Sequence, residues 1–152
     1  MGRFHSACAS LVLAAALSSA GCASHGPAPS AYGARAAAIA KQMVGVRYRY
    51  GGDDPHGFDC SGLAYYAYAR AGLVIPRDSV AQKHAAVAID LDHAAPGDLL
   101  FFDTRWNRHH VAIYLGDRRF VHAPTRGKRV AIDSLDDGYF SQHLTGVGRF
   151  AG

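Results

Sequence analysis

The 152-residue sequence predicts one α+β domain, in which helices from the first half of the chain pack on a small antiparallel β-sheet from the second half. Three observations predict this class. Apolar residues with helical spacing end near residue 87. Short apolar runs bounded by Gly, Asp, Asn or Pro follow Pro96-Gly97, as expected for strands. The sequence also contains no internal repeat, so a second domain is not expected.

The first 22 residues have the layout of a secretory signal peptide. Arg3 precedes an apolar stretch over residues 7–17, and small residues follow it. The stretch is too short for a permanent membrane-spanning helix, which needs about 20 residues. A buried core helix is the structural alternative, but the Pro/Gly/Ser/Ala-rich linker at 23–32 argues against it. We therefore expect the folded domain to span residues 33–152.

The signal peptide ends in "SAGC", which resembles a bacterial lipobox. The resemblance implies cleavage before Cys22, lipidation of this residue and a membrane anchor. Ser19 departs from the pattern, which prefers Leu at that position. Ala23, where Asp would retain a lipoprotein at the inner membrane, favours an outer-membrane lipoprotein that faces the periplasm. Ordinary secretion, with cleavage near Ala20 or Ala23, is the alternative.

The domain is expected to begin with a helix over residues 33–44. This segment is rich in helix formers and places its apolar residues on one stripe. The next segment, "GVRYRYGGDDPHGF" (45–58), is dense in glycine, proline and aspartate. These residues favour turns, so this segment is expected to be a loop.

Two further helices are expected before the strands. The segment "CSGLAYYAYARA" (60–71) fits a buried helix that ends at Gly72. A shorter helix is expected within 75–87, with Asp78 or Ser79 as its N-cap. The strands are expected from short apolar runs at residues 98–103, 110–116, 119–123, 129–133 and 146–150.

Cys60 is the only cysteine expected in the folded domain, because Cys8 leaves with the signal peptide and Cys22 is lipidated or lost. A lone thiol excludes a disulfide within the domain and a thiolate metal cluster. It could serve simply as a small buried apolar side chain. Its place at the expected start of a helix favours reactivity instead, because a helix N-terminus lowers the pKa of a thiol. Cys60 is therefore a candidate nucleophile.

A nucleophilic cysteine needs a base, normally histidine, and a group that orients the base. Alternation along "HVAIYLG" (110–116) places Val111 and every second residue after it on the core face and His110 on the other face. His122 lies in the next expected strand. If the two strands form a hairpin, the imidazoles of His110 and His122 are cross-strand neighbours and one can orient the other.

The motifs "YRYGG", "FDCSGLAYYAY", "PGDLLFF", "HVAIYLG" and "FVHAP" resemble, in this order, those of NlpC-type bacterial cell-wall cysteine peptidases. The resemblance covers about residues 33–150, and the spacings between Cys60, His110 and His122 fit it. One departure is Ala112, where the family often has Gly. The resemblance implies a papain-like core, with Cys60 as the nucleophile, His110 as the base and His122 as the orienting residue.

The same resemblance implies a function. Family members hydrolyse peptide bonds in peptidoglycan, between D-Glu and a diamino acid of the stem peptide or in the cross-links, and no metal or other cofactor is needed. Tyr50 would donate its hydroxyl to the oxyanion, beside the backbone N–H of the nucleophile. Asp59 and Ser61 would read an amine of the substrate. Arg77 and Ser79 would line the groove or cap a helix.

Composition and charge leave two other hypotheses open. The net charge of +4 favours anionic partners. The basic clusters are too short for a nucleic-acid site, so the expected partners of a monomer are peptidoglycan peptides and, through the anchor, a membrane. A non-catalytic wall-binding module on the same fold is one alternative, and its binding would survive alkylation of the thiol. A partial zinc set of His109, His110 and His122 is the other, and a chelator would test it.

Overall fold

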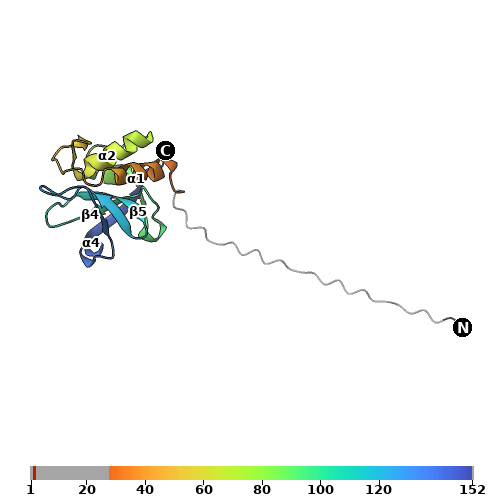
Figure 1. Ribbon diagram of the computed structural model, residues 1–152. Helices are drawn as coiled ribbons and strands as arrows, with labels where there is room; N and C mark the ends of the chain where they lie inside the picture. The colour runs from red at the N-terminus through yellow and green to blue at the C-terminus, as the bar shows by residue number, and fades with distance from the viewer. Residues whose placement is uncertain (1, 3–27, 152) are drawn as a thin grey trace.

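The computed structural model describes Gly2 and residues 28–151. In this part of the chain, a six-stranded antiparallel sheet carries helices α1 and α2 on one face and the short helix α4 on the other (Figure 1). This is the α+β arrangement that the sequence predicts. The predicted signal peptide, Cys22 and residues 23–27 of the predicted linker lie outside the described residues. Among the described residues, no helix combines the length and the hydropathy needed to cross a membrane.

Helix α1, Ala31–Gln42, begins and ends two residues earlier than predicted. Ser30 is its N-cap, and the Ser30 Oγ accepts a hydrogen bond from the backbone N–H of Gly33 at 3.4 Å. At Gly33 the helix lies close to the turn that contains Gly97, where a Cβ on Gly97 would overlap the backbone of Gly33. Its other buried residues are small: Ala36, Ala37 and Ala40.

The segment predicted as a loop contains a short hairpin whose two strands have two residues each. Strand β1, Asp53–Asp54, pairs with β2, Gly57–Phe58. Asp54 stabilises the turn, because its Oδ1 accepts a hydrogen bond from the backbone N–H of His56 at 2.7 Å. Gly51 has a φ of +71°, a left-handed conformation that favours glycine. The hairpin leads the chain directly into the next helix.

Helix α2, Cys60–Ala71, has the predicted bounds. Asp59 is the N-cap, and its Oδ1 accepts a hydrogen bond from the backbone N–H of Gly62 at 2.7 Å. Gly72, with a φ of +104°, ends the helix in the left-handed conformation. The buried face of α2 packs against both α1 and the sheet. Its first residue, Cys60, therefore lies in the core.

Helix α3, Ser79–Ala85, is shorter than predicted. Its N-cap is Asp78 and not Ser79, because Asp78 Oδ1 accepts a backbone hydrogen bond from the first turn at 2.9 Å. The end of the predicted helix forms instead β3, Val87–Ile89, which pairs with the last strand of the sheet. The β-branched residues of this short run favour a strand when a partner strand is available.

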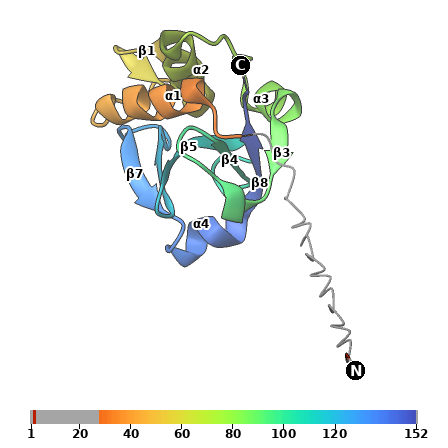
Figure 2. The same ribbon diagram turned by 90° about the vertical axis from the view of Figure 1, so that its right-hand side faces the viewer.

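The sheet has the strand order β3-β8-β4-β5-β6-β7, and these pairings are antiparallel. Strand β8, the last in the chain, lies between β3 and β4 (Figure 2). Five of the six strands start and end within two residues of the predicted runs, whereas β3 and α4 were not predicted. The remaining elements are the 3₁₀ helix η1 (Leu91–His93), β4 (Leu99–Phe102), β5 (His110–Gly116), β6 (Arg119–His122), β7 (Ala131–Ser134), α4 (Gly138–His143) and β8 (Leu144–Arg149).

Both faces of the sheet are buried. Val111 and Ile113 pack under α1 and α2, as the alternation along β5 predicts. The opposite face, which carries His110, is covered by α4, whose Phe140 packs with Tyr114 and neighbouring apolar residues. The side chains on both faces of β5 are therefore shielded from water, and His110 lies in the protein interior.

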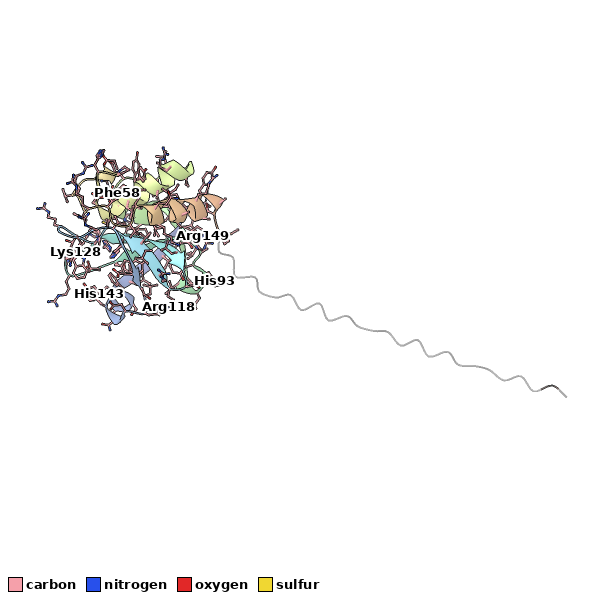
Figure 3. The ribbon with its side chains drawn as sticks, viewed as in Figure 1. Phe58, His93, Arg118, Lys128, His143 and Arg149 are labelled. Atoms are coloured by element: carbon pink, nitrogen blue, oxygen red, sulfur yellow. The ribbon has the colours of Figure 1, made fainter. Side chains whose placement is uncertain are left out.

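A buried ion pair joins β8 to the turn before β4. Arg149 donates hydrogen bonds from Nε and Nη2 to Asp98 at 2.8 and 2.6 Å, and from Nη2 to the carbonyl oxygen of His93 at 2.9 Å. Arg149 and His93 lie on the same side of the molecule in Figure 3. The bidentate hydrogen bonds between Arg149 and Asp98 compensate for the loss of water around both charges. They also hold the last strand in position.

Candidate active site

Cys60 lies where the N-terminus of α2 meets the start of β5. Its side chain is 7% exposed. The backbone N–H groups of Val111 and Ser61 interact with the sulfur. The side chain of Asn107 also donates to it, with Nδ2 at 3.4 Å from Sγ. Packing of α2 on the sheet thus brings the nucleophile to a segment about 50 residues further along the chain.

Burial raises the pKa of the Cys60 thiol. Hydrogen bonds from Val111, Ser61 and Asn107 lower this pKa, and the charge of Asp59 raises it, but burial outweighs the hydrogen bonds. The sequence predicted the opposite, a pKa lowered by the helix N-terminus. That prediction was wrong because the sulfur faces the sheet and not solvent. The resting sulfur is therefore a neutral thiol, which needs a base before it can attack.

His110 and His122 form a buried hydrogen-bonded pair. His110 Nε2 lies 2.8 Å from His122 Nδ1, and the two rings meet edge to face with centroids 5.0 Å apart. The strands thus make these imidazoles neighbours, as the hairpin pattern predicts. On its other side, His122 Nε2 lies 2.8 Å from Asp133 Oδ2. A hydrogen-bonded chain of three side chains therefore runs from the start of β5 through β6 to β7.

Burial lowers the pKa of His110 to about 3, and the neighbouring His122 acts in the same direction. His110 is therefore neutral at pH 7. Its Nδ1 is buried and has no hydrogen-bond partner among the described residues. A neutral imidazole with a free ring nitrogen can accept a proton from a nearby thiol.

Asp59 and Ser61, on either side of the nucleophile, are bound by Arg77. Arg77 donates from Nη1 and Nη2 to the two carboxylate oxygens of Asp59, each at 3.0 Å, and from Nη1 to Ser61 Oγ at 3.1 Å. Its Nε also reaches Asp53 at 3.3 Å. The sequence assigned Asp59 and Ser61 to a substrate amine and Arg77 to a groove or a cap. In the structure, the three form one network that holds the start of α2.

Residues 45–149 match the family model of the NlpC/P60 family. The chain belongs to this family. It is 40% identical over 114 residues to the murein DD-endopeptidase MepH of Escherichia coli (strain K12), a match that covers 71% of this chain and 42% of that protein. It is 36% identical over 113 residues to the gamma-D-glutamyl-L-lysine dipeptidyl-peptidase of Bacillus cereus (strain ATCC 10987 / NRS 248), over 72% of this chain and 34% of that protein.

Solved NlpC/P60 structures share the fold. An NlpC/P60 family protein from Bacillus cereus ATCC 10987 matches with a TM-score of 0.73 and 33% sequence identity, over 82% of this chain and 42% of that chain. The predicted α+β fold with a papain-like core is therefore confirmed. The match spans between about a third and two fifths of the length of these curated relatives.

Tyr50 and Tyr48 of this NlpC/P60 domain differ in burial and in their nearness to Cys60. Tyr50, the predicted oxyanion donor, is 78% exposed, and Arg126 lies over its ring at 5.9 Å from the centroid. Tyr48 is partly buried against the core. Burial raises the pKa of the Tyr48 hydroxyl, and the nearby Cys60 and Asp59 act in the same direction. Tyr48 is therefore a better candidate than Tyr50 for the oxyanion donor that the sequence predicts.

Ser79 lines a cavity of about 270 Å³ that reaches His110. It is the first residue of α3 and does not cap the helix. Lys83 on the same helix and Arg108 before β5 also line this cavity. Their positive charges favour a ligand that carries a carboxylate.

The zinc set considered from the sequence is not assembled. His109 is exposed, whereas His110 and His122 are buried and bonded to each other. The part of the chain that the structure describes holds no group of three His, Cys, Asp or Glu residues arranged for a metal ion.

Sequence reasoning missed two residues of this NlpC/P60 site. Asn107 lies in the loop before β5, where no local pattern indicates that its side chain turns to Cys60. Asp133 had a usable signal. It lies in a predicted strand that follows the strand of His122, and alternation places an acid there within reach of an imidazole.

Proposed function

We propose that this chain is a cysteine endopeptidase that hydrolyses peptide bonds in peptidoglycan stem peptides or cross-links. The observation that carries the proposal is the hydrogen bond from the backbone N–H of Val111 to the Cys60 sulfur at the start of α2. Val111 follows His110, which forms the buried pair with His122. Two relatives named as a gamma-D-glutamyl-L-lysine dipeptidyl-peptidase and a murein DD-endopeptidase support the substrate class.

The first half-reaction starts from a neutral thiol and a neutral imidazole. As the Cys60 sulfur attacks the carbonyl carbon of the scissile bond, the thiol proton passes to Nδ1 of His110. The Cys60 backbone N–H and the Tyr48 hydroxyl donate hydrogen bonds to the resulting oxyanion. The His110 imidazolium then protonates the leaving amine. The C–N bond breaks, and the acyl group remains on the sulfur as a thioester.

Water completes the cycle. His110 Nδ1 accepts a proton from water while the water oxygen attacks the thioester carbon. The tetrahedral intermediate expels the sulfur, which takes up the proton from His110, and the peptide leaves as a carboxylic acid. His122 keeps the His110 ring in one orientation through both half-reactions. Because burial lowers the pKa of His110, its imidazolium is a strong acid toward the leaving groups.

The names of the two relatives point to two different bonds. One is the bond from D-Glu to the diamino acid within a stem, and the other is a cross-link between two stems. The cavity beside His110, with Lys83 and Arg108 in its wall, supports a substrate with a carboxylate near the scissile bond. Mass spectrometry of fragments from uncross-linked and cross-linked muropeptides distinguishes the two bonds.

Replacement of the nucleophile tests the activity. Cys60→Ser should abolish the release of peptides from purified sacculi, because a serine hydroxyl is a far weaker nucleophile in this site. The circular dichroism spectrum and the thermal midpoint should stay near those of the parent protein. Ser141→Ala, which removes an exposed hydroxyl on α4, is the control and should release peptides normally. Unchanged release by Cys60→Ser would overturn the enzyme proposal and favour a wall-binding module.

We also propose that the mature chain begins at a lipidated Cys22 and acts as a monomer at the outer membrane, facing the periplasm. The "SAGC" sequence and relatives that act on the cell wall support this location. The mass of the mature N-terminal peptide distinguishes a lipidated Cys22 from a chain cleaved near Ala20 or Ala23 and secreted.

A further inference from the structure

We propose that Asp133 is a positioning residue that fixes the proton positions on both histidines, so that His110 Nδ1 keeps the free lone pair of a base. This role rests on the proposed function, because it assigns Asp133 to the same reaction. Asp133 itself contacts neither the sulfur nor the substrate. It acts through His122, to which its Oδ2 is hydrogen-bonded at 2.8 Å.

The sheet places Asp133 where it can do this. His122 on β6 pairs with Ala131 on β7, and Phe120 pairs with Asp133. Asp133 is therefore the diagonal neighbour of His122 on the same face of the sheet, a position that longer side chains can bridge. His122 is 1% exposed, whereas the Asp133 side chain is 46% exposed. The carboxylate thus links a fully buried imidazole to the surface.

With both imidazoles neutral, counting protons along the chain leads to a single arrangement. A carboxylate only accepts hydrogen bonds, so the proton in the bond to Asp133 is on His122 Nε2. In neutral His122 the other nitrogen, Nδ1, then carries a lone pair and accepts from His110 Nε2. Neutral His110 has its single proton on Nε2, and its Nδ1 is left unprotonated. This is the nitrogen that has no hydrogen-bond partner among the described residues.

The charge states of Asp133 and His110 near pH 7 support this arrangement. The hydrogen bond from His122 lowers the pKa of Asp133, which is therefore a carboxylate. Burial keeps His110 neutral. The rings packed against His122 from β6 and α4, Phe120 and Phe140, are apolar and hold no competing proton.

Other charges lie near Asp133 but do not pair with it in the described part of the chain. Lys128 and Arg129 line a cavity of about 690 Å³ that borders His122 and Asp133, and Lys128 lies at the outer edge of the molecule in Figure 3. On the other side, a surface hollow that also borders Asp133 is lined by Asp117, Arg119, Asp136 and Asp137. The side chain that is hydrogen-bonded to Asp133 is His122.

Loss of the carboxylate charge would allow the protons of both histidines to move to their other ring nitrogens. An amide at position 133 can donate a hydrogen bond to His122 Nε2, which moves the His122 proton to Nδ1. His122 then donates to His110 Nε2, and the proton of neutral His110 moves to Nδ1. That nitrogen can no longer accept the thiol proton. The wrong tautomer leaves the geometry of the site intact but removes its base.

The test compares Asp133→Asn with Asp133→Glu and with Asp136→Asn, an exposed neighbour that pairs with Arg118. An Asp-to-Asn change that acts directly on a catalytic imidazole lowers kcat about 10⁴-fold. Because Asp133 acts through a second imidazole, we expect a loss of about 10- to 100-fold in kcat for Asp133→Asn, with KM unchanged. Asp133→Glu should recover part of the rate, and Asp136→Asn should match the parent protein.

Nitrogen-15 NMR of the histidine rings provides a readout that needs no substrate. In the parent protein, His110 Nδ1 should have the shift of an unprotonated nitrogen, and in Asp133→Asn that of a protonated one. A protonated Nδ1 in the parent protein overturns the proposal even if the variant fails to fold, as does a parental kcat in Asp133→Asn. If the tautomers change as expected but the parent protein cleaves no peptidoglycan, the role of Asp133 stands and the proposed function falls.

Discussion

The charge on His110 is controlled by burial more than by any partner. Its side chain is fully buried, and burial lowers its pKa to about 3, far below the ordinary value of 6.5. Burial also raises the pKa of the Cys60 thiol. Both shifts disfavour a resting thiolate–imidazolium pair, because each charge would lie in a region of low dielectric. The Cys60 thiol and the His110 imidazole are therefore both neutral near pH 7.

The lowered pKa of His110 predicts acid-dependent stability. Between pH 6.5 and 3, the unfolded chain binds a proton at this position that the folded chain does not, so stability falls as pH falls. From pH 7 to pH 5 the loss should be about 2 kcal/mol, measured by urea unfolding. His110→Gln should flatten this dependence, whereas His84→Gln, which removes an exposed imidazole on α3, should leave it unchanged. An equal slope for His110→Gln and the parent protein would contradict the burial argument.

The first turn of α2 combines a cap with the nucleophile. Asp59 accepts the backbone N–H of Gly62 and also receives both arms of Arg77. A Cβ at Gly62 would overlap the carbonyl oxygen of Gly52, so the turn depends on glycine at this position. These contacts come from the hairpin, the helix and the segment before α3, and together they hold Cys60 in place.

Two aspartate N-caps allow a matched comparison of this turn. Asp59→Ala removes a cap from α2 and also leaves Arg77 without its bidentate partner, whereas Asp78→Ala removes only a cap from α3. Loss of a cap alone costs about 1 kcal/mol, and loss of a charged hydrogen-bond partner adds about 1.5–3 kcal/mol. Urea unfolding should therefore show a clearly larger loss for Asp59→Ala. Equal losses would mean that the Arg77 network does not stabilise the helix start.

Across the whole molecule, the strand order makes the last strand a central one. Strand β8 lies between β3 and β4, and Arg149 at its end pairs with Asp98 in the interior. The end of the described chain is therefore fixed inside the sheet and does not lie at its edge. The active-site strands β5 and β6 lie on the other side of β4 and depend on this arrangement for their position.

For the buried Asp98–Arg149 pair, we expect the effects of single substitutions on the free energy of unfolding to be strongly non-additive. Asp98→Leu or Arg149→Met alone should cost about 3–5 kcal/mol, because each leaves one charge buried without a partner. The double variant Asp98→Leu with Arg149→Met should lose much less than the sum, since no unpaired charge remains. Asp136→Ala, which breaks the exposed pair with Arg118, should cost about 1 kcal/mol or less. Urea midpoints measure all four, and an additive double variant would contradict the interpretation.

Local patterns in the sequence predicted most of the elements and the candidate reactive groups. Capping residues and apolar spacing predicted α2 to the residue and the strands from β4 to β8 to within two residues, because these signals act over a few positions of the chain. The motifs around Cys60, His110 and His122 predicted the family, which the comparisons confirm. The hairpin β1–β2, strand β3 and helix α4 were missed, because such short elements depend on what they pack against.

Only the tertiary structure decided the environment of each group. It buried the Cys60 sulfur and so reversed the predicted pKa shift, it favoured Tyr48 over Tyr50 beside the nucleophile, and it brought Asp133 to His122. The physical reason is that burial and cross-strand contact depend on the second surface that covers a residue, and this surface comes from a distant part of the chain. The candidate reactive residues follow from local sequence, whereas their protonation follows from the fold.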